Sequence, residues 1–119
     1  MEQFQADTDM DIDTAVAKKV NEHVVDLEQH EARDREKNIP TGGPHRPVLA
    51  IVVDMENPTG HVRIYDKDDN QVGVVQGRKN KDKTVIVSWK PGWQYVFYGA
   101  GACAVYHAYA RQDQEGREV

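Results

Sequence analysis

The stretch Thr84-Val-Ile-Val-Ser-Trp-Lys-Pro-Gly-Trp-Gln-Tyr-Val-Phe97 decides the fold class of this chain. β-Branched and aromatic residues dominate both sides of its Pro-Gly pair, and this composition favours strands. The Pro-Gly pair itself is typical of a tight turn. Because side chains alternate between the two sides of a strand, we expect the apolar ones to face one another across the turn. They are Val85, Val87 and Trp89 before it, and Trp93, Tyr95 and Phe97 after it.

Outward from this hairpin, the chain predicts six short strands. They cover residues 48–55, 61–65, 71–76, 84–90, 93–98 and 102–111. Turn-forming residues separate them, and no helical periodicity intervenes. Such a succession is typical of a small antiparallel β-sandwich or flattened barrel. The sequence therefore predicts a mainly β fold, with the β domain at residues 48–111 and a polar tail at 112–119.

The last predicted strand carries small residues on one side. They are Ala102, Ala104, Ala108 and Ala110, with Tyr106 among them. Small side chains allow another layer of the fold, or another subunit, to approach closely.

The first third of the chain has a different organisation. We expect an extended arm at residues 1–12, which carries Phe4 and Met10, and a single amphipathic helix at residues 13–38. A Pro- and Gly-rich linker at residues 39–47 follows. The helix is indicated by a stripe with 4-3-4-3 spacing: Val16, Val20, His23, Leu27 and His30. This stripe spans only about two heptads, so it needs the β domain or copies of itself to pack against.

Charge and composition narrow the range of partners. Residues 1–38 hold 11 Asp and Glu against 5 Lys and Arg, whereas residues 39–119 hold 9 against 10. An acidic arm argues against nucleic acid and suits a basic protein surface, or else it only keeps the arm soluble. No apolar run approaches the ~20 residues that cross a bilayer, and the start lacks signal-peptide features. The single Cys103 cannot form an intrachain disulfide, so we expect synthesis in a reducing cytoplasm.

The sequence contains no recognisable catalytic set, and we expect no enzyme activity, cofactor or metal. Cys103 has apolar neighbours and no suggestively placed histidine, which indicates a small buried side chain. Residues 66–70, Asp-Lys-Asp-Asp-Asn, open like a calcium-binding loop. However, Gln71 and Gly77 stand where that loop requires glycine and glutamate, so the segment is expected to be a hairpin turn.

The five histidines are not expected to form a ligand set. His23 and His30 are seven residues apart, about 10.5 Å along a helix, so one chain cannot bring both to one ion. In a symmetric bundle each would form its own ring, able to bind an anion or a metal or to respond to pH. Alternatively, they are polar interruptions that set the register of the helices.

Three aromatic residues, Trp89, Trp93 and Tyr98, are candidates for ligand or interface contacts. Tryptophans beside a tight turn can pack in the core, anchor a protein interface or stack on sugar rings. Tyr98 lies on the other side of its strand and is expected to be exposed.

In organisation, the chain resembles small virion proteins of tailed phages, particularly capsid decoration proteins and the bases of head or tail fibres. The resemblance lies in the arm, helix, linker and compact β domain, and residues 84–97 are similar to strand–Pro-Gly–strand segments of those proteins. It implies a virion component, a homo-oligomer such as a trimer, that binds neighbouring structural subunits through its arm and helix. The alternative is a carbohydrate-binding or adhesin module that uses exposed aromatic residues.

Overall fold

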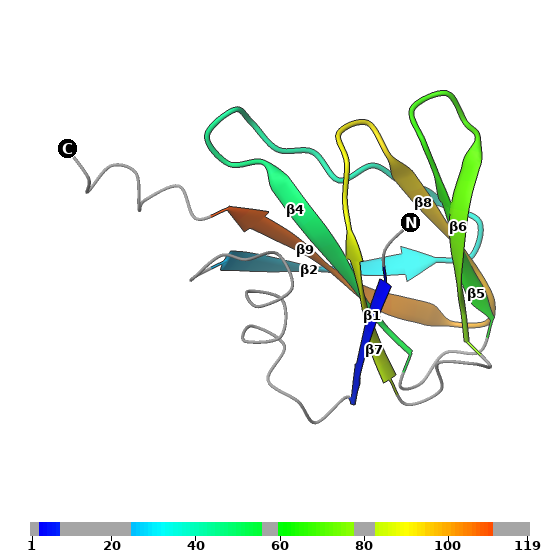
Figure 1. Cartoon of the computed structure of the whole chain (residues 1–119). Helices are drawn as coiled ribbons and strands as arrows, with labels where there is room; N and C mark the ends of the chain where they lie inside the picture. Colours follow the sequence, from blue (N-terminus) through cyan, green and yellow to red (C-terminus); the bar gives the residue numbers. More distant parts are fainter. Residues whose placement is uncertain (1–2, 8–24, 56–59, 78–82, 111–119) are drawn as a thin grey trace.

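Two antiparallel β-sheets, seen in the computed structural model in Figure 1, make up the fold. The structure describes residues 3–7, 25–55, 60–77 and 83–110, and within these ranges it contains strands but no helix. The five-stranded sheet has the order β1 (Gln3–Asp7), β7 (Lys83–Ser88), β4 (Val48–Asp54), β9 (Ala102–Ala110) and β2 (Val25–Arg33). The four-stranded sheet has the order β3 (Lys37–Asn38), β8 (Gln94–Tyr98), β5 (His61–Tyr65) and β6 (Gln71–Gln76).

The prediction of a mainly β, antiparallel fold is confirmed. All six predicted strands are present as β4 to β9, with ends that differ from the expected ones by at most two residues. β5 alternates between buried and half-buried side chains, whereas β4 and β8 carry continuous runs of buried residues, and turn-forming residues separate the strands.

The main core lies between the two sheets. The five-stranded sheet contributes Ile51, Val53, Val85, Val87 and Val105, and the four-stranded sheet contributes Val62, Ile64, Val75, Tyr95 and Phe97. Trp89 is buried among them, and Trp93 packs edge-on against it with ring centroids 5.4 Å apart. The apolar side chains on the two sides of the Pro-Gly turn therefore belong to one core, as expected.

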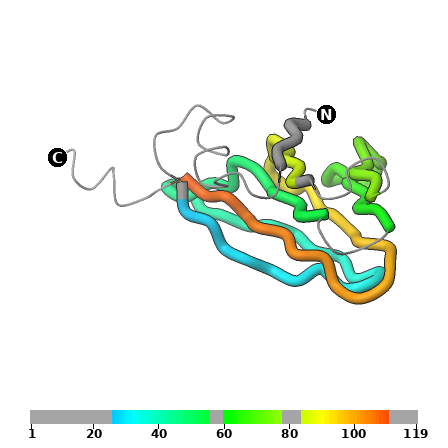
Figure 2. Tube along the Cα trace, turned by 90° about the horizontal axis from the view of Figure 1, so that it is seen from below, coloured from blue at the N-terminus to red at the C-terminus, as the bar shows by residue number. Residues whose placement is uncertain are grey.

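The helix expected at residues 13–38 is wrong for its second half. Residues 25–33 form strand β2 and residues 37–38 form β3, whereas residues 13–24 lie outside the described residues. Glu, Gln, Arg and Ala give this segment a high intrinsic helix propensity. Pairing with β9 outweighs this propensity. β2 pairs with β9 from Val25↔Ala110 to Arg33↔Ala102, and the pairing satisfies the backbone hydrogen-bonding groups that the two strands turn toward each other. Figure 2 shows β2 in blue running beside β9 in orange.

The expected hairpin turn between β5 and β6 is confirmed. Asp66 Oδ1 accepts backbone N–H bonds from Asp68 at 2.8 Å and from Asn70 at 2.9 Å. Asp69 adopts the left-handed φ of 66° that such a turn requires. The backbone hydrogen bond from Asn70, with that from Asp68, holds the pKa of Asp66 below its ordinary value.

The linker expected at residues 39–47 joins β3 to β4 and packs on the fold. Gly43 and Arg46 exchange backbone hydrogen bonds of 3.2 and 3.1 Å, and Pro47 O accepts one from Ala110 N at 3.0 Å. With Trp89 and the Pro91-Gly92 turn, this connection lines an apolar pocket of about 370 Å³.

Candidate functional site

A second apolar layer lies on the outer face of the five-stranded sheet, the face turned away from the four-stranded sheet. Its centre consists of Ala50, Val52, Ile86 and Ala108, all fully buried. The cross-strand register brings these residues together, because Val52 lies opposite Ile86 on β7 and Ala50 lies opposite Ala108 on β9. A two-sheet fold needs only the layer between its sheets, so this second layer requires its own explanation.

The margin of this outer layer keeps partial exposure. Leu27, Leu49 and Tyr106 pack against its centre and are half-buried. The expected row of small residues on β9 contributes to it through Ala108, whereas Ala102 at the far end of the strand is exposed. The layer thus ends in an apolar rim that another subunit can contact.

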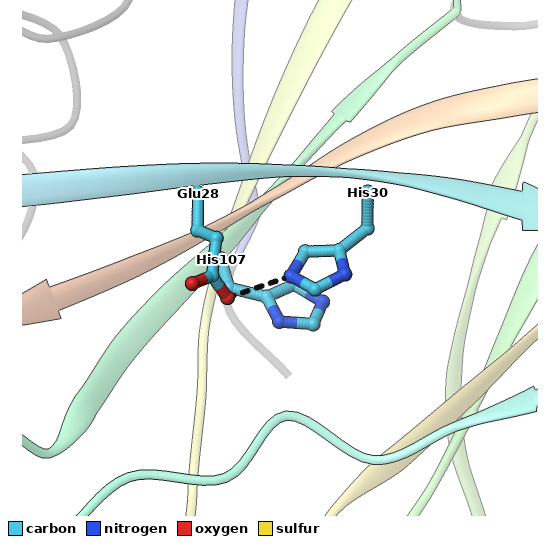
Figure 3. A group of neighbouring side chains, drawn as sticks. All are labelled: Glu28, His30 and His107. Carbon is cyan, nitrogen blue, oxygen red and sulfur yellow. Dashed lines mark hydrogen bonds and ion pairs between the residues drawn. The ribbon is translucent and has the colours of Figure 1, made fainter.

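A polar cluster, made of Glu28, His30 and His107, lies on the opposite, inner side of the same sheet. Glu28 and His30 are alternate residues of β2, so their side chains leave the strand on the same side. His107 on β9 is the register partner of Glu28. Figure 3 shows both β2 side chains meeting the ring of His107. Their candidate ligand atoms, two from imidazoles and one from a carboxylate, all lie within 4.8 Å of one another.

Short contacts connect the members of this cluster. His30 Nε2 lies 2.9 Å from Glu28 Oε1. The rings of His30 and His107 are stacked, with centroids 3.9 Å apart and an angle of 18° between their planes. His107 is buried, whereas the side chains of Glu28 and His30 retain 53% and 37% of their exposure. The cluster is therefore closed on the core side and open to solvent at the edge strand.

Two tyrosines hold the cluster from the side of the core. Tyr95 of the four-stranded sheet places its hydroxyl 2.8 Å from His107 Nε2 in a buried hydrogen bond. The hydroxyl of Tyr109 donates a longer bond of 3.4 Å to Glu28 Oε1. The guanidinium of Arg46 stacks on the Tyr109 ring at 4.0 Å and lies 3.8 Å from Asp26 Oδ2.

The surroundings shift the acid–base properties of the cluster. Burial, with a further effect of nearby His30, lowers the pKa of His107 to about 4, so its ring is neutral at physiological pH. The hydrogen bond from His30 holds the pKa of Glu28 below its ordinary value. At neutral pH the cluster therefore offers a nitrogen lone pair on the neutral His107 ring and a charged carboxylate oxygen on Glu28.

Cys103 takes no part in this cluster. It is fully buried in the core, as expected, with Sγ 3.7 Å from Asp54 O. Burial, with a contribution from Asp54, raises the pKa of the Cys103 thiol to about 12. A thiol held protonated and inaccessible is not an activated nucleophile.

A second group of polar side chains lies on the outer face of the four-stranded sheet. His61 stacks on Tyr98 with ring centroids 5.3 Å apart, and the Arg63 guanidinium lies 4.7 Å from the centre of the Tyr98 ring. Arg63 Nε donates a hydrogen bond of 3.0 Å to His61 Nε2. The group is cationic and half-exposed, which suits an anionic or sugar ligand better than a metal ion.

The three candidate aromatic residues do not form one platform. Trp89 and Trp93 belong to the core between the sheets, and Tyr98 is half-buried on the outer face. Tyr98 therefore keeps a possible ligand role, apart from both tryptophans.

Of the residues expected to attach the arm and the helix to neighbouring subunits, the structure describes Phe4, Leu27 and His30. Phe4 lies in β1 as the register partner of Ile86, and Met10, Val16, Val20 and His23 lie outside the described residues. Leu27 is on the outer face and His30 on the inner face. Residues three apart share a side of a helix but take opposite sides of a strand, so the predicted stripe is wrong for this pair.

Sequence reasoning missed the pairing of His30 with His107. The two histidines are far apart in the sequence, and the helix expected at His30 hid the alternation of Glu28 and His30. The only available signal was the E-x-H spacing itself, which is meaningful on a strand and uninformative without it.

Comparisons with known proteins return no match. No protein family fits the chain, and neither a curated protein nor a solved structure is significantly similar to it. In the described part of the chain, no helix is long and apolar enough to cross a membrane.

Proposed function

We propose that the protein is a non-enzymatic structural protein that binds neighbouring subunits of a large assembly through its N-terminal region. The observation that carries this proposal is the second apolar layer on the outer face of the five-stranded sheet. The centre of this layer is fully buried within the single chain, so its margin is the part that is open to a neighbour. Its half-exposed rim at Leu27, Leu49 and Tyr106 offers contact area to a neighbour.

The partner at this rim is the N-terminal region of a neighbouring copy. Leu27 belongs both to the rim and to the apolar sequence pattern that continues back through Val20 and Val16. Val16 and Val20 are the apolar side chains of the N-terminal region that this contact uses in the proposal. Packing of this region between copies yields a homo-oligomer, for which a trimer is our working assumption.

A tailed-phage virion is the assembly that we propose. The support is the resemblance in sequence organisation to capsid decoration proteins and fibre bases, although the structure places residues 3–7, 25–33 and 37–38 of the N-terminal third in the two sheets. Other structural proteins of the particle are the further partners in this proposal, and the protein is located in the virion after synthesis in the cytoplasm.

The oligomeric mass of the intact chain tests this proposal. Light scattering after size exclusion is expected to give an oligomer for the full-length protein. Leu27→Glu, which places a charge in the rim, is expected to weaken association at least about tenfold because a buried contact loses apolar surface. Gln29→Glu is the matched control, because Gln29 lies two residues further along the same strand on the same side and is exposed.

A truncation provides an independent arm of the test. Removal of residues 1–24, which also removes the edge strand β1 of the five-stranded sheet, is expected to yield a monomer that keeps a β circular-dichroism spectrum and cooperative unfolding. The cut must stop there, since residues 25–38 form strands β2 and β3. A monomeric full-length protein, or an oligomer that survives both Leu27→Glu and the truncation, contradicts the proposal.

A carbohydrate-binding or adhesin module is the second candidate, favoured by the stacked His61–Tyr98 pair and its arginine. Glycan-array binding that is lost in Tyr98→Ala and kept in Trp93→Ala supports this alternative. Equal loss in both variants indicates unfolding instead, because Trp93 packs against the core.

A further inference from the structure

We propose that Glu28, His30 and His107 form a binding site for a divalent transition-metal ion of the Zn²⁺ type, which fastens the edge strand β2 to β9. The site lies on the inner side of the five-stranded sheet, away from the outer apolar layer. It therefore does not rest on the proposed role in assembly.

The donor atoms define the class of ion. Two imidazole nitrogens and one carboxylate oxygen form a set that Zn²⁺ and its neighbours bind well. Calcium and magnesium prefer sites made of oxygen atoms alone. Three protein ligands leave one position of a tetrahedral ion for water.

The register of the two strands brings these atoms together. Glu28 and His30 are alternate residues of β2, and His107 lies directly opposite Glu28 on β9. The ligand atoms lie within 4.8 Å of one another, and His30 Nε2 lies 2.9 Å from Glu28 Oε1. Metal bonds of about 2.0–2.1 Å place tetrahedral ligand atoms ~3.3 Å apart, so rotation of side chains suffices to reach that spacing. The His30 ring must tilt out of its stack on His107, and its partial exposure permits this movement.

Neighbouring hydroxyls orient two of the ligands. The hydroxyl of Tyr95 occupies Nε2 of His107, which leaves Nδ1 as the ligand atom of that ring. Tyr109 contacts the carboxylate of Glu28. Partners of this kind fix the ring orientation and tautomer in metal sites, and their loss typically lowers affinity about 10–100-fold.

Charge and access also suit a cation. The nearby Arg46 is partly offset by Asp26, from which it lies 3.8 Å away, and its guanidinium stacks on Tyr109. Glu28 adds a second negative charge at the site itself. Because the side chains of Glu28 and His30 are partly exposed at the edge strand, an ion can enter from solvent without unfolding the sheet.

Titration of the metal-free full-length protein with Zn²⁺ and Co²⁺ tests the proposal. Calorimetry is expected to show one site per chain, and Co²⁺ to give the visible absorption of a tetrahedral ion. His30→Gln and Glu28→Gln are each expected to weaken binding at least about tenfold, since each removes a ligand from a partly exposed position. Zinc is expected to raise the melting temperature of the parent protein and not that of these variants.

Matched variants distinguish a built site from general surface binding. His61→Gln removes a histidine of the other sheet, and Glu31→Gln removes a carboxylate from the opposite side of β2. Both are expected to bind Zn²⁺ as the parent does. Tyr95→Phe keeps the buried ring but loses the bond to His107, and is expected to weaken binding about tenfold.

Two results would overturn the proposal. One is the absence of saturable Zn²⁺ or Co²⁺ binding by the folded parent protein. The other is Zn²⁺ binding that does not depend on the cluster. This would show as binding that persists in the double variant E28Q/H30Q, or as equal weakening by His61→Gln and His30→Gln. Circular dichroism of each variant shows whether a loss reflects unfolding.

Discussion

The inner and outer polar groups of this molecule have the same local arrangement on different sheets. In each, one strand supplies two alternate polar residues and its neighbour supplies a ring opposite the first of them. The inner group is Glu28 and His30 on β2 with His107 on β9, and the outer group is His61 and Arg63 on β5 with Tyr98 on β8.

The two groups differ in burial and charge. His107 is buried between the sheets, and its neighbours present acceptor atoms. In the outer group Arg63 supplies the cation itself, as it bonds to His61 and stacks on Tyr98 in a half-exposed position. Strand register decides which side chains meet, whereas the side of the sheet decides whether they meet in water or in a medium of low dielectric constant.

The largest expected difference is in the reactivity of a cysteine thiol placed on one or the other side of β9. Cys103 faces the core, and Ala102 beside it is exposed. Because burial raises the pKa of Cys103 from 9.0 to about 12, its thiolate fraction at pH 8 is about a thousandfold below that of an ordinary thiol. Reaction with a disulfide reagent is expected to be slower by at least this factor than in the variant C103A/A102C.

The same shift predicts a dependence of stability on pH. A raised pKa means that the folded state holds the proton more tightly. The contribution of the Cys103 thiol to the free energy of unfolding is therefore complete below pH 9.0 and is lost as the pH rises toward about 12. Urea unfolding of Cys103→Ala is expected to show a smaller loss of stability over this range. Equal losses of stability at alkaline pH in both proteins would contradict the burial of the Cys103 thiol. Fast reaction of native Cys103 with the disulfide reagent would contradict it as well.

Removal of the His107 ring or of the His61 ring tests the difference in burial between the inner and the outer group. His107→Ala is expected to lower the free energy of unfolding by about 3 kcal/mol, because it leaves a cavity and an unpaired Tyr95 hydroxyl. His61→Ala, on the outer face, is expected to cost less than about 1 kcal/mol. Urea unfolding in chelator measures both, and similar values would show that the two environments do not differ.

Removal of single tyrosine hydroxyls is expected to have a smaller effect. Tyr95→Phe leaves a buried histidine nitrogen without its partner and is expected to cost about 1–2 kcal/mol. Tyr98→Phe removes a hydroxyl that bonds with Tyr65 on the outer face, at a cost below about 0.5 kcal/mol. Thermal unfolding of the two variants compares them directly, and the reverse order would refute the assignment of inner and outer sides.

A small effect is also expected for Arg63→Gln. Its guanidinium stacks on Tyr98 in a half-exposed position, where such a contact contributes about 0.5–1 kcal/mol. The free energy of unfolding is expected to fall by no more than this amount. A loss above about 2 kcal/mol would indicate that the outer group is a structural element comparable to the inner one.

The β domain was predictable because its signals are local. Val85, Val87 and Trp89 are β-branched or aromatic residues at every second position, and a Pro-Gly turn follows them, so both the strand and the side that faces the core could be expected. The turn at Asp66 was equally local, because its carboxylate bonds to backbone groups two and four residues away.

The inner cluster was not predictable because its cause is not local. β2 has the residues of a helix and becomes a strand by pairing with β9. His30 thereby moves to the side opposite Leu27 and next to His107, which no spacing within the N-terminal third indicates.

The sequence by itself determined the antiparallel β class, the six strands of the β domain, the core around the Pro-Gly turn and the burial of Cys103. Apolar alternation and turn chemistry are properties of neighbouring residues, so they act before the fold is complete. Only the tertiary structure decided the course of residues 25–38, the second apolar layer and the meeting of Glu28, His30 and His107. These depend on backbone pairing between distant segments, whose hydrogen bonds and burial outweigh the modest helix preference of each residue.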